Sequence, residues 1–394
     1  MKILLVFLGN EPLRPISVNY AVYTRGLQEL GYEVLTVCRP GLEAGCEFPL
    51  VVPPHEDEFR SVDYWRSFGA DAAIALTWLR FGEELGAMRA AGLKTINLTD
   101  SDGYATPRSH PGEWLKRMTI YHRGQMKLRT AIFWLKRYLR PREDIERVLL
   151  CLEESDSAIL HSTASIANLR KFTDRFPDKH LERKLHLVPY PINDLFCEAD
   201  VTLKPRVKRF VAVGRWDDPQ KAAGLLVRTL ERYAEQGGTA EVAICGRKGD
   251  AVFGPLVKRY PQFKYLGTQT REQMLELYLT SRSVLFTSIW ETGPIAVGEA
   301  LASGCSLVGV PLMNFVTYHL VGPYGRCSPD RDPQKLAEAM DAEMRSWDAG
   351  ERRPEEIARF WRARLNARTV CRELLATVGI GQTLQNTSDK GELV

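Results

Sequence analysis

The stretch Ser283–Gly304 decides the fold, and it reads SVLFTSIWETGPIAVGEALASG. Its first five residues, SVLFT, predict a short buried strand. Pro294 is suited to the first turn of a helix, and Gly304 to the position just after a helix end. We therefore expect a strand, a loop and a short helix. The free amides and the positive dipole end at the start of that helix favour an anion such as a diphosphate.

Two glutamates accompany this helix. Glu291 precedes it and Glu299 lies inside it, so one carboxylate can reach a sugar while the other reaches a ribose. A plain alternative is a helix-start acid and a surface charge, because two glutamates at this spacing are common. The small apolar residues around Glu299 instead favour a buried carboxylate, which needs a polar partner.

A second polar loop follows an earlier apolar run, in the stretch Val211–Lys221, which reads VAVGRWDDPQK. Lys221 falls at a predicted helix start, where a positive charge opposes the helix dipole unless it meets an anion. Arg215 offers a planar fork for phosphate oxygens, and Lys221 a compact charge. The alternative is a surface ion pair between Arg215 and Asp217 or Asp218.

Short apolar runs alternate with helix-period segments along the chain, which is typical of an α/β fold with parallel sheets. Two such series are joined near 190–207. They predict two Rossmann-like, doubly wound domains, residues 1–203 and 204–353, that face each other across a cleft at the carboxyl ends of their strands. A last helix is expected over 354–378, and 379–394 is expected to form a mobile tail.

The composition is that of a globular protein. The 394 residues are 44% apolar and 26% charged, which suffices for two cores, and the net charge of +4 is too small to imply a polyanion partner. Eight cysteines form no C-x-x-C pair, which favours free thiols in a reducing cytosol. The apolar opening is too short for a signal peptide, and no run reaches the ~20 residues that cross a bilayer. We expect a cytoplasmic protein, either free or attached to the inner face of the membrane.

The motifs together resemble the retaining GT-B glycosyltransferases of family 4, specifically over 185–345 and only in topology before that. The residues that carry the resemblance occur in the family's order: the interdomain segment Val188–Asn193, Gly214-Arg215 with Lys221, the strand and glycine turn Ala243–Gly246, the nucleotide-base region Tyr265–Gly267, Glu291-x7-Glu299, and Ala302-Ser303-Gly304.

This resemblance implies a metal-independent hexosyltransferase that retains anomeric configuration. A UDP- or GDP-linked sugar would be the donor co-substrate, no cofactor would be needed, and the acceptor would be a glycan, a lipid-linked molecule or a small molecule. Arg215 and Lys221 would hold the diphosphate and Glu291 the donor sugar, as the catalytic set. The residues expected to bind the donor are Gly9, Asn10, Gly214, Gly246, Arg247, Leu266, Thr292, Gly293, Ile295 and Glu299. The last helix would cross back to the N-terminal domain.

The chain departs from the family in informative places. Ala222 follows Lys221 where a glycine is usual. The N-terminal glycine-rich loop is reduced to Gly9-Asn10. Asp100 and Asp102 follow a predicted strand where relatives often have a histidine, so they contact the acceptor or donor sugar, or they cap a turn.

A basic segment spans 114–142, with nine Lys or Arg residues and no Asp or Glu. One helical stripe contains Trp114, Met118, Tyr121, Leu128, Ile132, Leu135 and Leu139. This stripe either packs on the N-terminal domain or attaches the protein to an anionic membrane surface or a polyanionic acceptor. No nucleic-acid recognition fold is visible, so we expect no nucleic-acid partner.

Two other functions are compatible with the architecture. A nucleotide-sugar epimerase needs acid and base groups facing the sugar ring, and the pairing of Glu291 with Glu299 argues against it. A non-catalytic scaffold would not need the complete set of Arg215, Lys221, Glu291 and Glu299.

Overall fold

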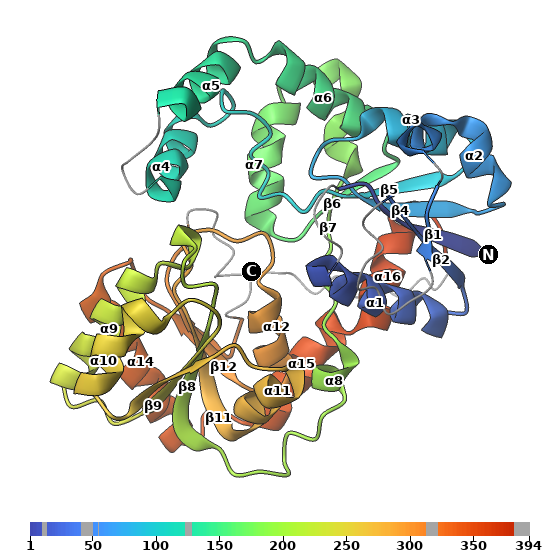
Figure 1. The fold of residues 1–394 in the computed structure, drawn as a ribbon. Coiled ribbons are helices and arrows are strands. Elements are labelled where there is room, and N and C mark those ends of the chain that lie inside the picture. Colours follow the sequence, from blue (N-terminus) through green and yellow to red (C-terminus); the bar gives the residue numbers. More distant parts are fainter. Residues whose placement is uncertain (10–13, 41–49, 54, 123–127, 313–321, 382–394) are drawn as a thin grey trace.

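A computed structural model describes the chain except for residues 10–13, 41–49, 54, 123–127, 313–321 and 382–394, and except for the side chains of 14–20 and 121. Figure 1 shows two lobes, one coloured blue to green and the other yellow to orange, with the red C-terminal helices running between them. The lobes correspond to two separate sheets.

The first lobe contains a parallel sheet in which the described strands follow the order β3-β2-β1-β4-β5-β6-β7. Helices cover the sheet, so its central strands are buried on both faces and their sequences are continuous apolar runs. The strands are β1 (Lys2–Phe7), β2 (Glu33–Cys38), β3 (Leu50–Val51), β4 (Ala72–Leu76), β5 (Lys94–Leu98), β6 (Ser157–Leu160) and β7 (Leu185–Leu187). The helices are α1 (Arg14–Glu29), α2 (Val62–Ser67), α3 (Gly82–Ala90), α4 (Pro111–Tyr121), α5 (Leu128–Leu139), α6 (Arg142–Glu153) and α7 (Thr163–Thr173).

The second lobe contains a parallel sheet whose described strands follow the order β10-β9-β8-β11-β12-β13. The strands are β8 (Val207–Val213), β9 (Glu241–Cys245), β10 (Phe263–Gly267), β11 (Ser281–Phe286), β12 (Ser306–Gly309) and β13 (Gly325–Cys327). The helices are α8 (Asp194–Cys197), α9 (Ala223–Glu235), α10 (Asp250–Arg259), α11 (Arg271–Thr280), α12 (Ile295–Ala302) and α14 (Pro333–Asp348). Two parallel, helix-covered sheets confirm the predicted α/β fold class. β8 and β11 are neighbours, so the two polar loops that follow them, which are predicted to bind the donor, lie side by side at the carboxyl ends of the strands.

The C-terminal segment differs from the single predicted helix over 354–378. It forms two helices, α15 (Pro354–Leu365) and α16 (Ala367–Ala376). Asn366 separates them because its backbone is extended and its side chain accepts a hydrogen bond from the Thr369 amide at 2.9 Å, capping α16.

These two helices pack in different lobes. Trp361 of α15 belongs to the core of the second lobe, whereas Cys371 of α16 belongs to that of the first. A Cβ on Gly26 of α1 would lie 2.6 Å from the Ala367 carbonyl oxygen, so glycine allows α1 and α16 to approach closely. The Ile192 amide bonds the Leu365 carbonyl at 2.8 Å, so both chain crossings between the lobes lie together.

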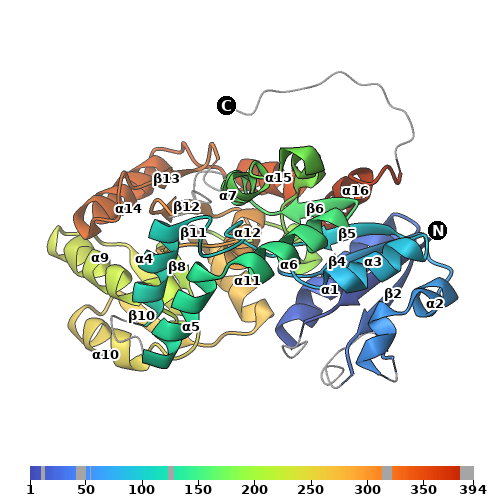
Figure 2. The same cartoon turned by 90° about the horizontal axis from the view of Figure 1, so that it is seen from above.

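The basic segment contains α4 and α5, which stand apart from the first sheet (Figures 1 and 2). α4 contacts the 3₁₀ turn Pro219–Lys221 of the second lobe, whereas α5 lies beside α6 of the first lobe. Trp114 and Met118 of α4 line the space between the lobes. Leu128 and Leu139 of α5 are exposed, as are Ile132 and Leu135. The interpretation that this stripe packs on the N-terminal domain is therefore wrong for α5, because an amphipathic pattern does not say which surface its apolar side faces.

Other expectations concern single features. The seven described cysteines are free, and Cys46 lies outside the described residues. Within the described part of the chain, no helix is long and apolar enough to cross a membrane. The predicted mobile tail falls outside the described residues from 382 onward.

Candidate functional site

The two polar loops expected to bind the donor are hydrogen-bonded to each other. The Ile289 amide donates to the Gln220 carbonyl oxygen at 2.8 Å, and the Gln220 side chain donates to the Trp290 carbonyl at 2.7 Å. The Thr287 hydroxyl donates to the Lys221 carbonyl oxygen at 2.9 Å. These bonds fix the position of Lys221 relative to the loop that contains Glu291.

Lys221 and Glu291 form an ion pair with 2.5 Å between Nζ and Oε1, and both side chains are largely buried. Lys221 ends a 3₁₀ turn, and Ala222 continues the chain with a φ of 51°. This left-handed conformation favours glycine, because an alanine in that region costs about 1 kcal/mol. The chain keeps the turn despite that strain, and so keeps the lysine facing the glutamate.

Arg215 follows β8 and lies at the same carboxyl-terminal end of the sheet. Its guanidinium contacts the Asp218 carboxylate at 2.9 Å, and its side chain is 57% exposed. The structure thus contains the surface pair that the sequence left as an alternative, while Asp217 pairs with Lys248 at 2.9 Å. An exposed pair of this kind contributes about 0–1 kcal/mol, so a phosphate can replace Asp218 at little cost.

Glu299 lies on α12 and is partly buried. Burial raises the pKa of its carboxyl group to about 7, and Arg271 opposes the shift. Among the described residues, no side chain forms a hydrogen bond or an ion pair with this carboxylate. A carboxyl group in such surroundings favours a ligand that donates hydrogen bonds to it.

Glycines bring the neighbouring strand ends together. Gly246 has a φ of 122°, and a Cβ on it would lie 1.8 Å from the Gly214 carbonyl oxygen, which no other residue type tolerates. The Gly246 amide also donates to the Gly267 carbonyl at 2.7 Å. Arg247 and Leu266 are exposed beside these turns. The predicted donor-binding residues at the ends of β8, β9 and β10 therefore lie together at the carboxyl-terminal end of the sheet.

Asp100 connects the two lobes. Its carboxylate accepts hydrogen bonds from the Trp78 indole at 3.0 Å, from the Tyr190 hydroxyl, and from the Thr292 hydroxyl of the second lobe at 3.2 Å. A φ of 39° places Asp100 in the strained left-handed region. The structure therefore makes it an interdomain contact at the site, rather than a simple turn cap.

Asp102 supports a second contact between the lobes. It forms an ion pair with Arg117 of α4, and it accepts a hydrogen bond from the Tyr104 amide at 3.3 Å. The Arg117 guanidinium lies over the Tyr104 ring at 4.1 Å and over the Trp290 ring at 4.9 Å. Trp290 directly precedes Glu291, so α4 packs against the loop of the candidate site.

Gly9 and Gly293 leave space for two aromatic side chains, those of Trp78 and Tyr190, that contact Asp100. A Cβ on Gly9 would lie 2.3 Å from the Trp78 ring, and one on Gly293 would lie 2.3 Å from the Tyr190 ring. Asn10, which was also expected at the donor, lies outside the described residues.

These residues border two adjoining cavities that share Glu291. A cleft of about 640 Å³ between the lobes is lined by Asp100, Asp102, Arg215, Glu291 and Thr292, together with aromatic side chains of α4 and α5. A smaller cavity of about 150 Å³ in the second lobe is lined by Lys221, Glu291, Gly293 and Ile295. The structure brings the expected catalytic set and the two aspartates together, whereas their roles remain predictions.

Comparison with known proteins identifies the family model and the folds that this chain resembles. Residues 207–345 match the family model described as Glycosyl transferases group 1. The structure resembles a glycosyltransferase from Rickettsia africae (TM-score 0.65, 12% identity, 96% of this chain and 97% of that one). It also resembles the Anabaena protein HepE in complex with UDP-glucose (TM-score 0.63, 14% identity, 96% and 99%). A third match is AviGT4, a glycosyltransferase involved in avilamycin A biosynthesis (TM-score 0.61, 16% identity, 96% and 97%).

The fold is that of the GT-B glycosyltransferases. The match to the family model covers the second lobe, where the motifs occur, whereas the structural matches extend over both lobes of the GT-B fold. The search of curated proteins found no match to this chain.

Sequence reasoning missed several residues of the GT-B cleft. Tyr190 donates to Asp100 and stacks on His161 with 3.6 Å between ring centroids. Burial lowers the pKa of His161, so its imidazole is neutral, and its Nδ1 lies 2.8 Å from the Val188 carbonyl oxygen. Only Tyr190 carried a signal, because it lies in the interdomain segment that the resemblance had marked.

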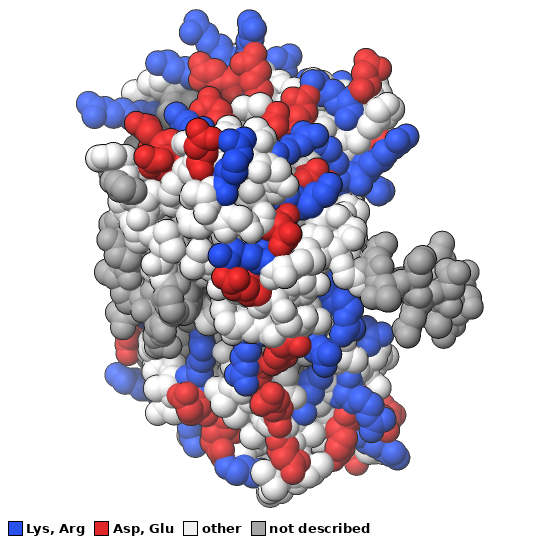
Figure 3. Space-filling view, turned by 90° about the vertical axis from the view of Figure 1, so that its right-hand side faces the viewer, with Lys and Arg blue, Asp and Glu red and all other residues white. Residues whose placement is uncertain are grey.

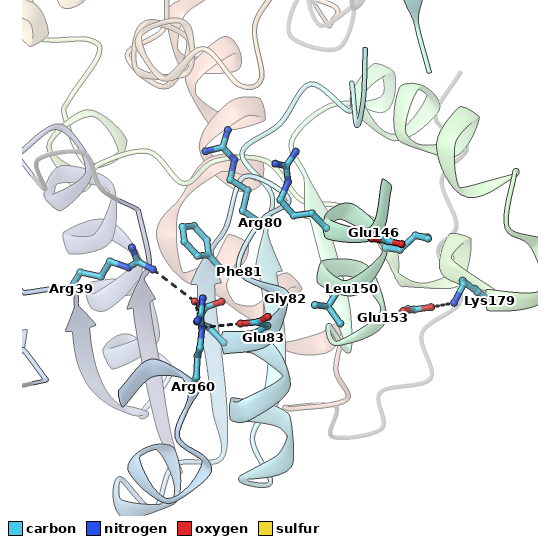
Figure 4. Close-up of a pocket in the computed structure, with 13 residues that line it drawn as sticks. Arg39, Arg60, Arg80, Phe81, Gly82, Glu83, Glu146, Leu150, Glu153 and Lys179 are labelled. Atoms are coloured by element: carbon cyan, nitrogen blue, oxygen red, sulfur yellow. Dashed lines mark hydrogen bonds and ion pairs between the residues drawn. The ribbon is translucent and has the colours of Figure 1, made fainter. Parts of the chain in front are cut away.

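A separate hollow of about 720 Å³ lies on the first lobe of the GT-B fold (Figure 4). Arg60 contacts Glu83 at 2.9 Å there, and Lys179 contacts Glu153. Figure 4 shows Arg80 pointing away from these pairs. The residues lining the hollow include none of those expected at the site, and ion pairs occupy most of its charged groups.

Proposed function

We propose that this protein is a retaining, metal-independent glycosyltransferase. It would move a hexose from a UDP- or GDP-linked donor to a glycan, a lipid-linked molecule or a small molecule. The observation that carries the proposal is the Lys221–Glu291 ion pair, held at the cleft beside Arg215 by bonds between two strand-end loops. Retention rests on the resemblance of the motifs to retaining enzymes.

The donor nucleotide binds along the carboxyl ends of the strands in the sheet of the second lobe. HepE, which shares the fold, has been solved with UDP and glucose and with UDP-glucose, so UDP is the first candidate. The Glu299 carboxylate accepts hydrogen bonds from the ribose hydroxyls. The exposed Leu266 side chain and the turn at Gly246 provide a surface for the base.

Breaking the sugar–phosphate bond leaves negative charge on the departing diphosphate. Arg215 and Lys221 stabilise that charge, and the Lys221 ammonium is already held in place by Glu291. Arg215 exchanges its exposed contact with Asp218 for a phosphate oxygen. We propose that these two cations do this work without a metal ion.

Glu291 binds hydroxyl groups of the donor sugar, and the turn Thr292–Gly293 borders the same space. The acceptor enters from the first lobe, past Asp100 and the aromatic side chains of Trp114 and Trp134. Such rings combine an apolar face with a polar edge, which suits an amphipathic acceptor.

Donor hydrolysis tests the proposal without knowledge of the acceptor, because water can take the acceptor's place. We expect the protein to release nucleoside diphosphate from an α-linked hexose donor, with α-hexose as the first product observed by proton NMR. Arg215→Ala should release it about 100-fold more slowly, since one cation that stabilises the leaving group is lost. If the first product is the β-anomer, the enzyme does not retain the anomeric configuration. If a donor binds but no nucleoside diphosphate is released, the alternative of a non-catalytic scaffold is favoured.

A further inference from the structure

Helix α5 exposes an apolar stripe to solvent. Of its twelve residues, all of which are described, none is buried. Leu128 is 75% exposed and Leu139 is 64% exposed, and Ile132 and Leu135 lie between them on the same stripe at helical spacing. Phe133 is exposed beside this stripe. The outward face of α5 is therefore apolar along its whole length.

Such a face is unusual for a protein surface in water. Large exposed apolar side chains usually occur singly, yet half of those among the described residues lie in α4 and α5. They are Leu115, Leu128, Ile132, Phe133, Leu135 and Leu139. A helix of this length is marginal alone in water and usually depends on burial of an apolar face. Another surface should therefore cover this face.

The charges of the segment 114–142 indicate which surface that is. Arg129, Lys136 and Arg140 are exposed next to the apolar stripe, and 114–142 contains no acidic residue. The face of the molecule on the right-hand side of Figure 1 differs, because Figure 3 shows Lys and Arg interspersed with Asp and Glu there. An apolar stripe flanked by cations matches an anionic bilayer, in which acyl chains take the apolar side chains and headgroups take the charges.

The other side of α5 contacts the rest of the protein, and these contacts orient the apolar stripe toward solvent. Arg137 forms a bidentate ion pair with Asp144 of α6 at 2.7 and 2.8 Å, and its guanidinium lies 4.8 Å from the centre of the Trp134 ring. Trp134 contacts Trp114 edge to face at 5.6 Å between centroids. Both tryptophans and Arg137 line the interdomain cleft. Helix α5 thus has one side toward the cleft and its exposed apolar stripe on the other side.

We propose that the outward face of α5 binds the surface of an anionic membrane. Leu128, Ile132, Leu135 and Leu139 insert between the lipids, and Arg129, Lys136 and Arg140 contact the headgroups. Membrane binding would hold the interdomain cleft close to the bilayer. It does not depend on the donor site, so the two proposals can fail separately.

Vesicle flotation with the full chain tests the proposal. We expect the wild type to float with vesicles of phosphatidylcholine containing about 30 mol% phosphatidylglycerol, and to bind vesicles of pure phosphatidylcholine at least about tenfold less. The double variant Ile132→Ser/Leu135→Ser should lose binding about tenfold or more. Because neither side chain is buried, its unfolding temperature should match the wild type.

The matched control is Leu203→Ser, because Leu203 is a leucine of similar exposure (72%) outside α4 and α5, and this variant should bind as the wild type does. The proposal is overturned if the wild type does not float with anionic vesicles, or if the double variant floats equally well. It is also overturned if sedimentation shows a dimer that the double variant converts to a monomer and no vesicle binding is seen, because a second copy would then cover the face.

Discussion

Lys221→Ala should lower kcat/KM for the donor by about 100- to 1,000-fold, because the variant lacks a cation placed where the leaving diphosphate gains charge. Its free energy of unfolding should also fall by about 3 kcal/mol, since the largely buried Glu291 carboxylate loses this counter-charge. Donor hydrolysis measures the first effect, and urea unfolding the second.

A double variant separates these two effects. Lys221→Met/Glu291→Gln removes both charges at similar volume, so most of the lost stability should return while activity stays low. Activity that recovers together with stability would show that the pair only supports the fold. Full activity in Lys221→Ala would contradict the role assigned to the lysine.

Glu299→Gln should change how stability depends on pH. Burial holds the pKa of Glu299 at about 7 in the folded protein, against an ordinary value of 4.5. Between these two pH values the folded state keeps a proton that the unfolded state has released, so the wild type loses stability as pH rises through this window. Glutamine has no proton to lose. The variant should therefore be more stable than the wild type at pH 8, by up to about 3 kcal/mol, and equally stable at pH 4.

Thermal unfolding from pH 4 to pH 8 measures this difference, with Glu338→Gln as the control because Glu338 is an exposed glutamate on α14. A saturating nucleotide should stabilise Glu299→Gln less than the wild type at pH 8, because the ionised carboxylate accepts hydrogen bonds from the ribose. Equal stability of the two proteins at every pH would show that Glu299 is not in the buried environment described.

The sequence could predict the donor side of the site because its polar residues directly follow apolar strands. Arg215 follows β8 and Glu291 follows β11, and these two strands are adjacent and parallel. The place of each residue in the sequence, just after a strand, therefore predicted that both would lie at the carboxyl-terminal end of the sheet. The contact of Asp100 with Tyr190 and Thr292 could not be predicted, since three separate segments meet there only after the lobes pack together.

Two other features were equally inaccessible from the sequence. Periodicity identified the apolar stripe of α5, but an amphipathic pattern does not say whether the stripe faces a core, a membrane or a second protein. The helix pattern of 354–378 also concealed the break at Asn366, because a single capping residue changes the backbone without changing the periodicity.

Nucleotide-induced stabilisation tests the central claim most directly. UDP, GDP, ADP and dTDP are each added to the wild type, to Arg215→Ala and to Arg232→Ala. Arg232 is a matched control, because it forms an i,i+3 ion pair with Glu235 at 3.0 Å and is 59% exposed, yet it lies outside the cleft. We predict that one nucleotide, at about one hundred times its dissociation constant, stabilises the wild type and Arg232→Ala by about 2.7 kcal/mol, and Arg215→Ala much less. If no nucleotide stabilises the wild type at millimolar concentration, or if all three proteins respond equally, the proposed donor site is wrong.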